Sequence, residues 1–170
     1  LGNLKNQIGV IKEPKSVVVI TKFLETLPSN EMRSGLAEML KHGLIYDKKY
    51  WDKLKDLNNL NTDDLDELIK ESIEIKNKIV SEDLTENGIR KSLNFGHTLG
   101  HAIESYFLES EDKKALLHGE AIAVGMILES FLSLKLNLIS NEEYAEIKYI
   151  ITDVFEKVEF NEVDIQKIID

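Results

Sequence analysis

The amino-acid sequence predicts a mainly α-helical fold with one short β-strand near the N-terminus. Apolar residues recur three and four positions apart, as in amphipathic helices, through most of the chain after residue 28. Only residues 16–21, which read SVVVIT, form a β-branched run typical of a strand. With 170 residues, of which 42% are hydrophobic, the chain can bury a sizeable core. We therefore expect an entry segment over residues 1–28 and a helical domain over residues 29–170.

Composition excludes several classes of function. The net charge of −10 argues against nonspecific binding to nucleic acid or to an anionic membrane surface. The longest apolar run, residues 121–128, is far shorter than the roughly 20 residues that cross a bilayer. Because the chain has no cysteine, a metal ion could be held only by nitrogen and oxygen ligands. A cytoplasmic location fits this composition.

The first helices follow from their apolar positions. Residues 23–27 predict a short helical turn that Pro28 ends, and residues 47–57 predict another amphipathic helix. Between them, a helix starting near Ser29 has one apolar stripe, made of Met32, Leu36, Met39, Leu40 and Gly43. Glu38 and Lys41 lie on roughly the other side of this helix. From spacing alone, they are interpreted as a solvated ion pair.

A long helix is expected over residues 62–80. Its predicted buried stripe is made of Leu65, Leu68, Ile69, Ser72, Ile73, Ile79 and Val80. Lys76 lies near the centre of this stripe. Burial of an unpaired ammonium is costly, so Lys76 either extends to solvent or meets an anion, and the sequence leaves both open.

The next helix is the most polar on one side. On a helix through residues 90–104, one stripe about 80° wide contains Arg90, Asn94, His97, His101 and Glu104. The opposite side is apolar. Because one face is polar and the opposite face is apolar, we expect the polar face to carry residues for binding or catalysis.

Three further helices complete the chain. Residues 118–134 are apolar around most of the helix circumference, which predicts the central helix of the core. Ser140 and Glu143 form a capping box before the next helix. Residues 163–169 begin one more helix, which we expect to continue in a longer protein.

The histidines favour a metal site without assigning its ligands. His97 and His101 are four residues apart, a spacing suited to metal binding, and His118 follows in a separate HGE segment. A zinc protease would need Glu after the first histidine, where this chain has Thr98. Hydrogen bonding of the histidines to backbone or carboxylate groups stays open as an alternative. Spacing cannot decide which histidines bind metal and which handle protons or phosphate.

Three ordered blocks resemble the 3-dehydroquinate synthase family of the sugar-phosphate cyclase superfamily. They are RSGLAEMLKHGLIYD at residues 33–47, GIRKSLNFGHTLGHAIE at 88–104 and LHGEAIAVGM at 117–126, and KNQIG at 5–9 agrees as well. The resemblance covers the helical, C-terminal, metal- and substrate-binding domain of a two-domain enzyme and the crossover into it. The nucleotide-binding N-terminal half and a lysine-bearing C-terminal segment have no counterpart here.

The resemblance implies a site residue by residue. Its metal ligands, for zinc or cobalt, would be Glu38, His97 and His118. Lys41, Lys76, Glu86, Arg90, Asn94 and His101 would surround the substrate, and Lys5 and Asn6 would contribute to substrate or cofactor binding from the entry segment. NAD would be bound mainly by the absent half. The implied reaction converts 3-deoxy-D-arabino-heptulosonate 7-phosphate, a phosphorylated sugar acid, to 3-dehydroquinate and phosphate in the shikimate pathway, in a homodimeric enzyme.

Three alternatives remain at this stage. They are another sugar-phosphate cyclase, a domain of an iron-dependent polyol dehydrogenase, and a non-catalytic helical scaffold. The combination of Lys76, Arg90 and Asn94 favours a carboxylated, phosphorylated substrate over a plain alcohol. We expect this chain alone not to turn over substrate.

Overall fold

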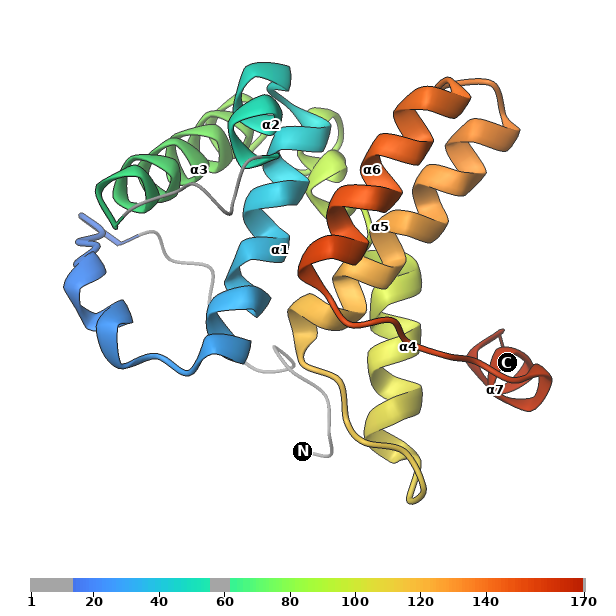
Figure 1. Ribbon diagram of the computed structural model, residues 1–170. Coiled ribbons are helices and arrows are strands. Elements are labelled where there is room, and N and C mark those ends of the chain that lie inside the picture. Colours follow the sequence, from blue (N-terminus) through green and yellow to red (C-terminus); the bar gives the residue numbers. More distant parts are fainter. Residues whose placement is uncertain (1–13, 56–61, 170) are drawn as a thin grey trace.

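The computed structural model describes residues 14–55 and 62–169 and confirms a mainly helical fold (Figure 1). Its elements, with η for a 3-10 helix, are η1 (Thr21–Thr26), α1 (Ser29–Ile45), α2 (Lys48–Leu54), α3 (Thr62–Glu82), η3 (Ile89–Asn94), α4 (His97–Glu109), α5 (His118–Lys135), α6 (Asn141–Val154) and α7 (Glu162–Ile169). Lys5 and Asn6 lie outside the described residues. No helix in the described ranges is both long and apolar enough to cross a membrane.

The strand expected over residues 16–21 is wrong for this structure. Residues 16–20 have no regular secondary structure, and Thr21 already begins η1. Val17 and Val18 are 74% and 79% exposed. A β-branched run becomes a strand only when a neighbouring strand pairs its backbone groups, and none of the described segments offers one.

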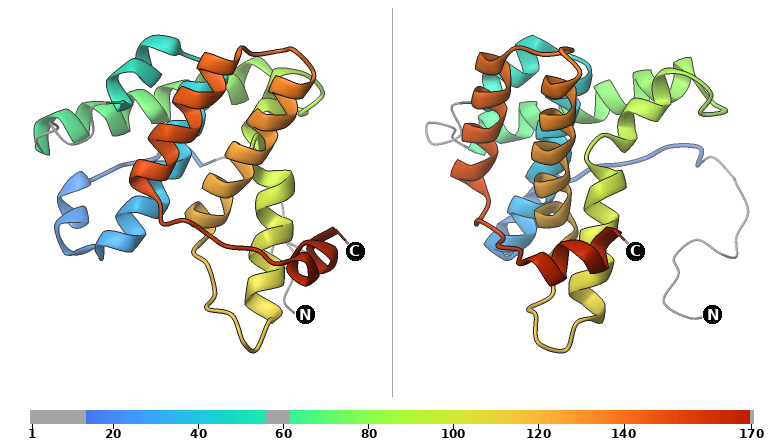
Figure 2. Two further views of the ribbon diagram at one scale, coloured as in Figure 1. Left: turned by 45° about the vertical axis from the view of Figure 1, so that its right-hand side comes forward. Right: turned by 90° about the vertical axis from the view of Figure 1, so that its right-hand side faces the viewer.

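Helix α5 is the centre of the fold, as its apolar circumference predicted. It contacts α1, α4 and α6, while α2 and α3 pack against α1 (Figures 1 and 2). Each of these helices contributes deeply buried apolar side chains, among them Leu40, Leu54, Ile79, Ile103, Ile122, Met126 and Ile151. The core therefore lies where α1 and α5 meet, and both helices carry predicted site residues.

Helices α4 and α5 approach each other closely because glycine occupies the crossing. A Cβ added at Gly125 of α5 would lie 2.0 Å from the carbonyl oxygen of Gly96, which is shorter than any tolerated contact. Gly96 itself has a φ of +77°, a left-handed conformation that glycine adopts without strain. The glycines therefore bring the start of α4 against the middle of α5.

The single helix predicted over residues 90–104 is broken in the structure. Arg90 and Asn94 belong to η3, Gly96 turns the chain, and α4 begins at His97. The carboxylate of Glu129 in α5 accepts hydrogen bonds from the amides of Gly96, at 2.8 Å, and Leu99, at 3.4 Å. Tertiary contacts thus stabilise a new helix start at Gly96, and the polar stripe is divided between two elements.

The predicted stripe of α3 is confirmed only in part: Leu68, Ser72 and Ile79 are buried as expected, whereas Ile73 is not. The buried side chains are Leu68, Ser72, Ile75 and Ile79, whose spacing of four, three and four residues follows one helical face. Ile73 is 43% exposed and Lys76 is exposed. The prediction that Lys76 lies in a buried stripe is therefore wrong, because α3 packs on α1 through a face rotated away from it.

The helix ends agree better with the sequence. Ser140 and Glu143 form the predicted capping box, with hydrogen bonds of 3.1 and 2.8 Å.

At the C-terminal end, buried Asp164 of α7 accepts hydrogen bonds from Tyr106 of α4 and Lys113, each at 2.7 Å. These bonds hold α7 beside α4 (Figure 2).

Candidate metal and anion site

The three histidines singled out in the sequence meet at the ends of two helices. His97 and His101 lie one turn apart at the start of α4, and His118 is the first residue of α5. The ring centroids of His97 and His118 are 5.5 Å apart, and those of His97 and His101 are 5.2 Å apart. One ring nitrogen of each histidine lies within 4.8 Å of the others, so this cluster could hold a metal ion.

Glu38 of α1 adds a carboxylate to this cluster. Its Oε1 lies 3.5 Å from Nε2 of His97, while its Oε2 accepts a hydrogen bond of 2.7 Å from Lys41. Oε1 is buried and has no hydrogen-bond partner among the described residues. The Nδ1 of His97 lies 3.2 Å from the carbonyl oxygen of Phe95 and can donate to it, which leaves Nε2 as an acceptor. Two facing acceptors fit a cation between them.

Burial and charge tune these groups. Burial is the main cause that lowers the pKa of His97, and the positive charge of Lys41 lowers it further. Neutral imidazole is the form that binds a metal. For Glu38, burial is the largest single effect and raises the pKa, but the hydrogen bond and charge of Lys41, together with His97, lower it overall. The carboxylate is therefore ionised.

The interpretation of Glu38 and Lys41 as a solvated pair is wrong. The side chain of Lys41 is only 3% exposed and that of Glu38 is 31% exposed. Burial lowers the pKa of Lys41, and its ion pair with Glu38 counteracts this effect. Helix α1 presents both residues to the interior because it packs between α3 and α5, which the spacing within α1 alone could not reveal.

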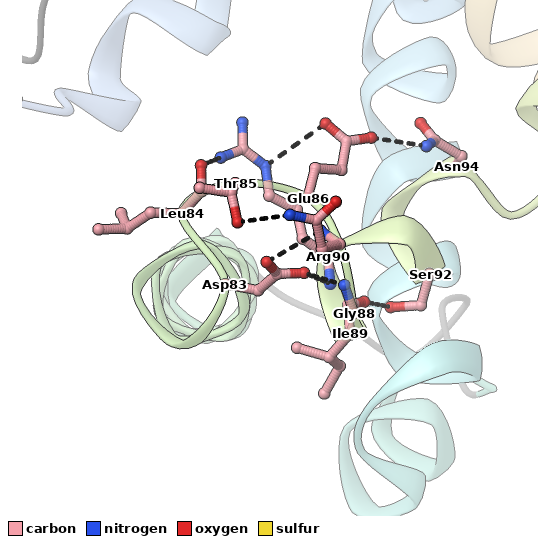
Figure 3. Close-up of polar contacts among 10 residues, drawn as sticks. Asp83, Leu84, Thr85, Glu86, Gly88, Ile89, Arg90, Ser92 and Asn94 are labelled. Carbon is pink, nitrogen blue, oxygen red and sulfur yellow. Dashed lines mark hydrogen bonds and ion pairs between the residues drawn. The ribbon is translucent and has the colours of Figure 1, made fainter.

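A second group of predicted residues gathers around η3. Glu86 Oε1 accepts a hydrogen bond of 2.9 Å from the Asn94 amide, and its Oε2 lies 3.8 Å from Nε of Arg90. Arg90 also donates to the carbonyl oxygen of Leu84 at 3.2 Å (Figure 3). Asn94 is three residues before His97, so η3 connects this group with the histidine cluster.

Lys76 contributes charge rather than a contact. It makes no ion pair within the described ranges, and the Glu86 carboxylate contacts Arg90 and Asn94. Its positive charge nevertheless acts on buried residues of α1, since it helps to lower the pKa of both Lys41 and His42. Lys76 is thus an exposed cation near buried Lys41 and His42 of α1.

Two supporting residues, Glu104 and Ser34, were given no role from the sequence. The Glu104 carboxylate lies 3.1 Å from Nδ1 of His118 and orients that ring. Ser34 accepts a hydrogen bond of 2.9 Å from the amide of Gly119, which fixes the start of α5. Glu104 was placed in the polar stripe with His97 and His101, but the stripe did not show that it would orient His118. Ser34 had no local signal.

His42 provides a pH-dependent prediction. It is 3% exposed, its Nδ1 lies 2.8 Å from the Ser72 hydroxyl, and burial lowers its pKa from 6.5 to about 4. In the unfolded chain, His42 is therefore protonated below about pH 6.5, whereas in the folded chain it is protonated only below about pH 4. The free energy of unfolding should fall by about 3 kcal/mol between these pH values through His42 alone.

Urea unfolding of the metal-free chain at several pH values measures this loss. His42→Asn should be less stable at pH 7 but lose less stability on acidification than the parent. Parallel pH profiles for the two proteins would contradict the prediction.

The fold and the site define a class: a helical domain that gathers histidine, carboxylate and cationic side chains where its helices meet. Residues 35–170 match the family described as 3-dehydroquinate synthase C-terminal, and the chain therefore belongs to that family.

Similar proteins agree with this assignment, and each is named 3-dehydroquinate synthase. The relative from Geobacillus kaustophilus is 47% identical over 133 residues, which are 76% of this chain and 35% of the relative. The relative from Nitratiruptor sp. is 41% identical over 144 residues, 85% of this chain and 40% of the relative. The relative from Streptococcus pyogenes serotype M6 is 46% identical over 141 residues, which are 82% of this chain and 38% of the relative. The matched part of the chain thus spans about 35–40% of the length of these curated relatives.

Proposed function

We propose that this chain is the metal- and substrate-binding part of a 3-dehydroquinate synthase. The observation that carries the proposal is the buried, unpartnered Oε1 of Glu38, 3.5 Å from the acceptor Nε2 of His97, in a chain of this family. Such a pair is unfavourable without a positive charge between its members. Residues 29–170 would form the binding domain, and residues 1–28 would lead into it.

The proposed ligands of the metal, zinc or cobalt, are Glu38, His97 and His118. His118 is suited to this role because Nδ1 faces Glu104, which leaves Nε2 for the ion. Held by these three residues, the ion would supply Lewis-acid stabilisation of negative charge that develops on a substrate oxygen. His101 would remain outside the ligand set and be free to exchange protons.

The other residues would bind the substrate, 3-deoxy-D-arabino-heptulosonate 7-phosphate. Lys76 and Arg90 carry the positive charge that suits its carboxylate. Asn94 and His101 would contact the phosphate end or relay protons as phosphate leaves, while Lys41 would meet the hydroxyls. Glu86 would hold Arg90 and Asn94 in place. Lys5 and Asn6 would approach from the entry segment.

The remaining parts of the activity would come from outside this chain. NAD would be bound mainly by a nucleotide-binding half, as the relatives' greater length allows, and the full enzyme would be a cytoplasmic homodimer in the shikimate pathway. This chain alone would bind metal and substrate without turning the substrate over.

Calorimetry tests the proposal directly. The chain should bind one zinc ion, and the zinc-loaded chain should bind the phosphorylated sugar acid. Lys76→Met should weaken substrate binding about tenfold, since an ion-assisted hydrogen bond contributes about 1.5 kcal/mol or more. Lys70→Met is the matched control, because Lys70 is another exposed lysine of α3, 3.9 Å from Glu74. Binding of glycerol but not of the sugar acid would instead indicate a polyol dehydrogenase domain.

A further inference from the structure

Two residues proposed to bind the substrate, Arg90 and Asn94, depend on one turn, formed by residues 83–90. The carboxylate of Asp83 accepts three backbone hydrogen bonds there (Figure 3). Oδ1 accepts from the amide of Asn87 at 3.1 Å, and Oδ2 accepts from those of Gly88 at 2.7 Å and Arg90 at 3.1 Å. One side chain therefore satisfies the amides that lead into η3.

The backbone of this turn is unfavourable without such support. Glu86 has a φ of +57°, a left-handed conformation that residues with a side chain adopt rarely. A residue is held in this region when surrounding contacts over-determine it. Here the bonds to Asp83 hold the chain immediately after Glu86, and the Glu86 amide also bonds the Asp83 carbonyl oxygen at 3.5 Å.

The side chain of Glu86 connects this turn to Arg90 and Asn94. Its carboxylate accepts from Asn94 and lies beside Arg90, whose guanidinium donates to Leu84 in the same turn (Figure 3). We propose that Asp83 is a positioning residue for the substrate: its carboxylate fixes the turn that presents Glu86, Arg90 and Asn94. This inference rests on the proposed function.

Asp83 has little part in the stability of the core. It lies just after the end of α3, and the amides that donate hydrogen bonds to it belong to the turn and to η3, not to α3. The apolar neighbours in the turn, Leu84 and Ile89, are 65% and 44% exposed. These backbone bonds also lower the pKa of Asp83, that of Gly88 most strongly, so the carboxylate is ionised at neutral pH. Loss of the carboxylate should therefore disturb the turn and leave the helices folded.

The test compares Asp83→Ala and Asp83→Asn with the parent and with Asp153→Ala. Asp153 is an exposed aspartate of α6 without a hydrogen bond or ion pair in the described part of the chain. Zinc affinity, affinity of the zinc-loaded chain for 3-deoxy-D-arabino-heptulosonate 7-phosphate, and the NMR signals of the Arg90 Nε–H and the Asn94 amide are measured.

For Asp83→Ala, we expect substrate affinity to fall about tenfold and the Arg90 and Asn94 signals to move toward random-coil positions. Zinc affinity should stay within about twofold of the parent. Asp83→Asn should show a smaller loss, because its amide oxygen still accepts backbone hydrogen bonds. Asp153→Ala should behave as the parent.

Two results would overturn the role of Asp83. One is unchanged substrate affinity in Asp83→Ala, and the other is an equal loss of zinc affinity, substrate affinity and stability, which would make Asp83 structural. A parent that binds neither zinc nor substrate would refute the proposed function instead. The NMR signals would then decide about the turn, and unchanged Arg90 and Asn94 signals in Asp83→Ala would overturn the inference.

Discussion

Replacement of His118 by alanine is expected to weaken zinc binding by about 100-fold or more. Loss of a residue that only orients a ligand already costs 10- to 100-fold, so loss of a ligand should cost at least the upper value. The side chain of His118 is 40% exposed, and its one described hydrogen bond is to Glu104. Helix content should therefore be unchanged. Competition with a chromophoric chelator measures the affinity, and circular dichroism measures the helix content.

The matched control for this prediction is His101→Ala. His101 belongs to the same histidine cluster but is not a proposed ligand, so its loss should reduce zinc affinity by less than about tenfold. Glu38→Gln should behave as His118→Ala. If His101→Ala proved as damaging as His118→Ala while Glu38→Gln had no effect, the three histidines alone would hold the ion and our ligand set would be wrong.

Replacement of Gly125 by alanine is expected to destabilise the chain by about 3 kcal/mol, at the upper end of the usual cost of overpacking. The new Cβ would lie 2.0 Å from the Gly96 carbonyl oxygen and 2.8 Å from the Gly100 amide nitrogen. Neither backbone atom can move without shifting the start of α4. Zinc affinity should fall too, because His97 follows Gly96 directly. Urea unfolding and zinc titration check the two effects.

Gly35→Ala provides the control for Gly125→Ala. Gly35 is an exposed residue within α1, and a Cβ added there would meet nothing within 4 Å. Alanine is the better helix former, so this variant should be more stable by about 0.5 to 1 kcal/mol. Equal stability changes in the two variants would show that the crossing of α4 and α5 is not as close as the structure indicates.

Local patterns predicted several helices well, but they failed at residues 90–104, where one expected helix is two, and at the N-terminal segment. The central helix α5, the capping box of Ser140 and Glu143, and the final helix α7 all depend on neighbouring residues within one helix, and all three are confirmed. The run at residues 16–21 has strand propensity, but a strand also requires a partner from elsewhere. Propensity within the run carries no information about that partner.

The sequence by itself determined the family, the helical class and which polar residues are candidates for the site. Three short family-like segments and helical spacing suffice for this, because both are properties of residues close together in the chain. Only the tertiary structure decided how those residues meet. Glu129 starts a new helix at Gly96, which separates Arg90 from His97, and packing of α1 between α3 and α5 buries Lys41. These outcomes depend on contacts between distant segments, where burial and hydrogen bonding override the periodicity of any single helix.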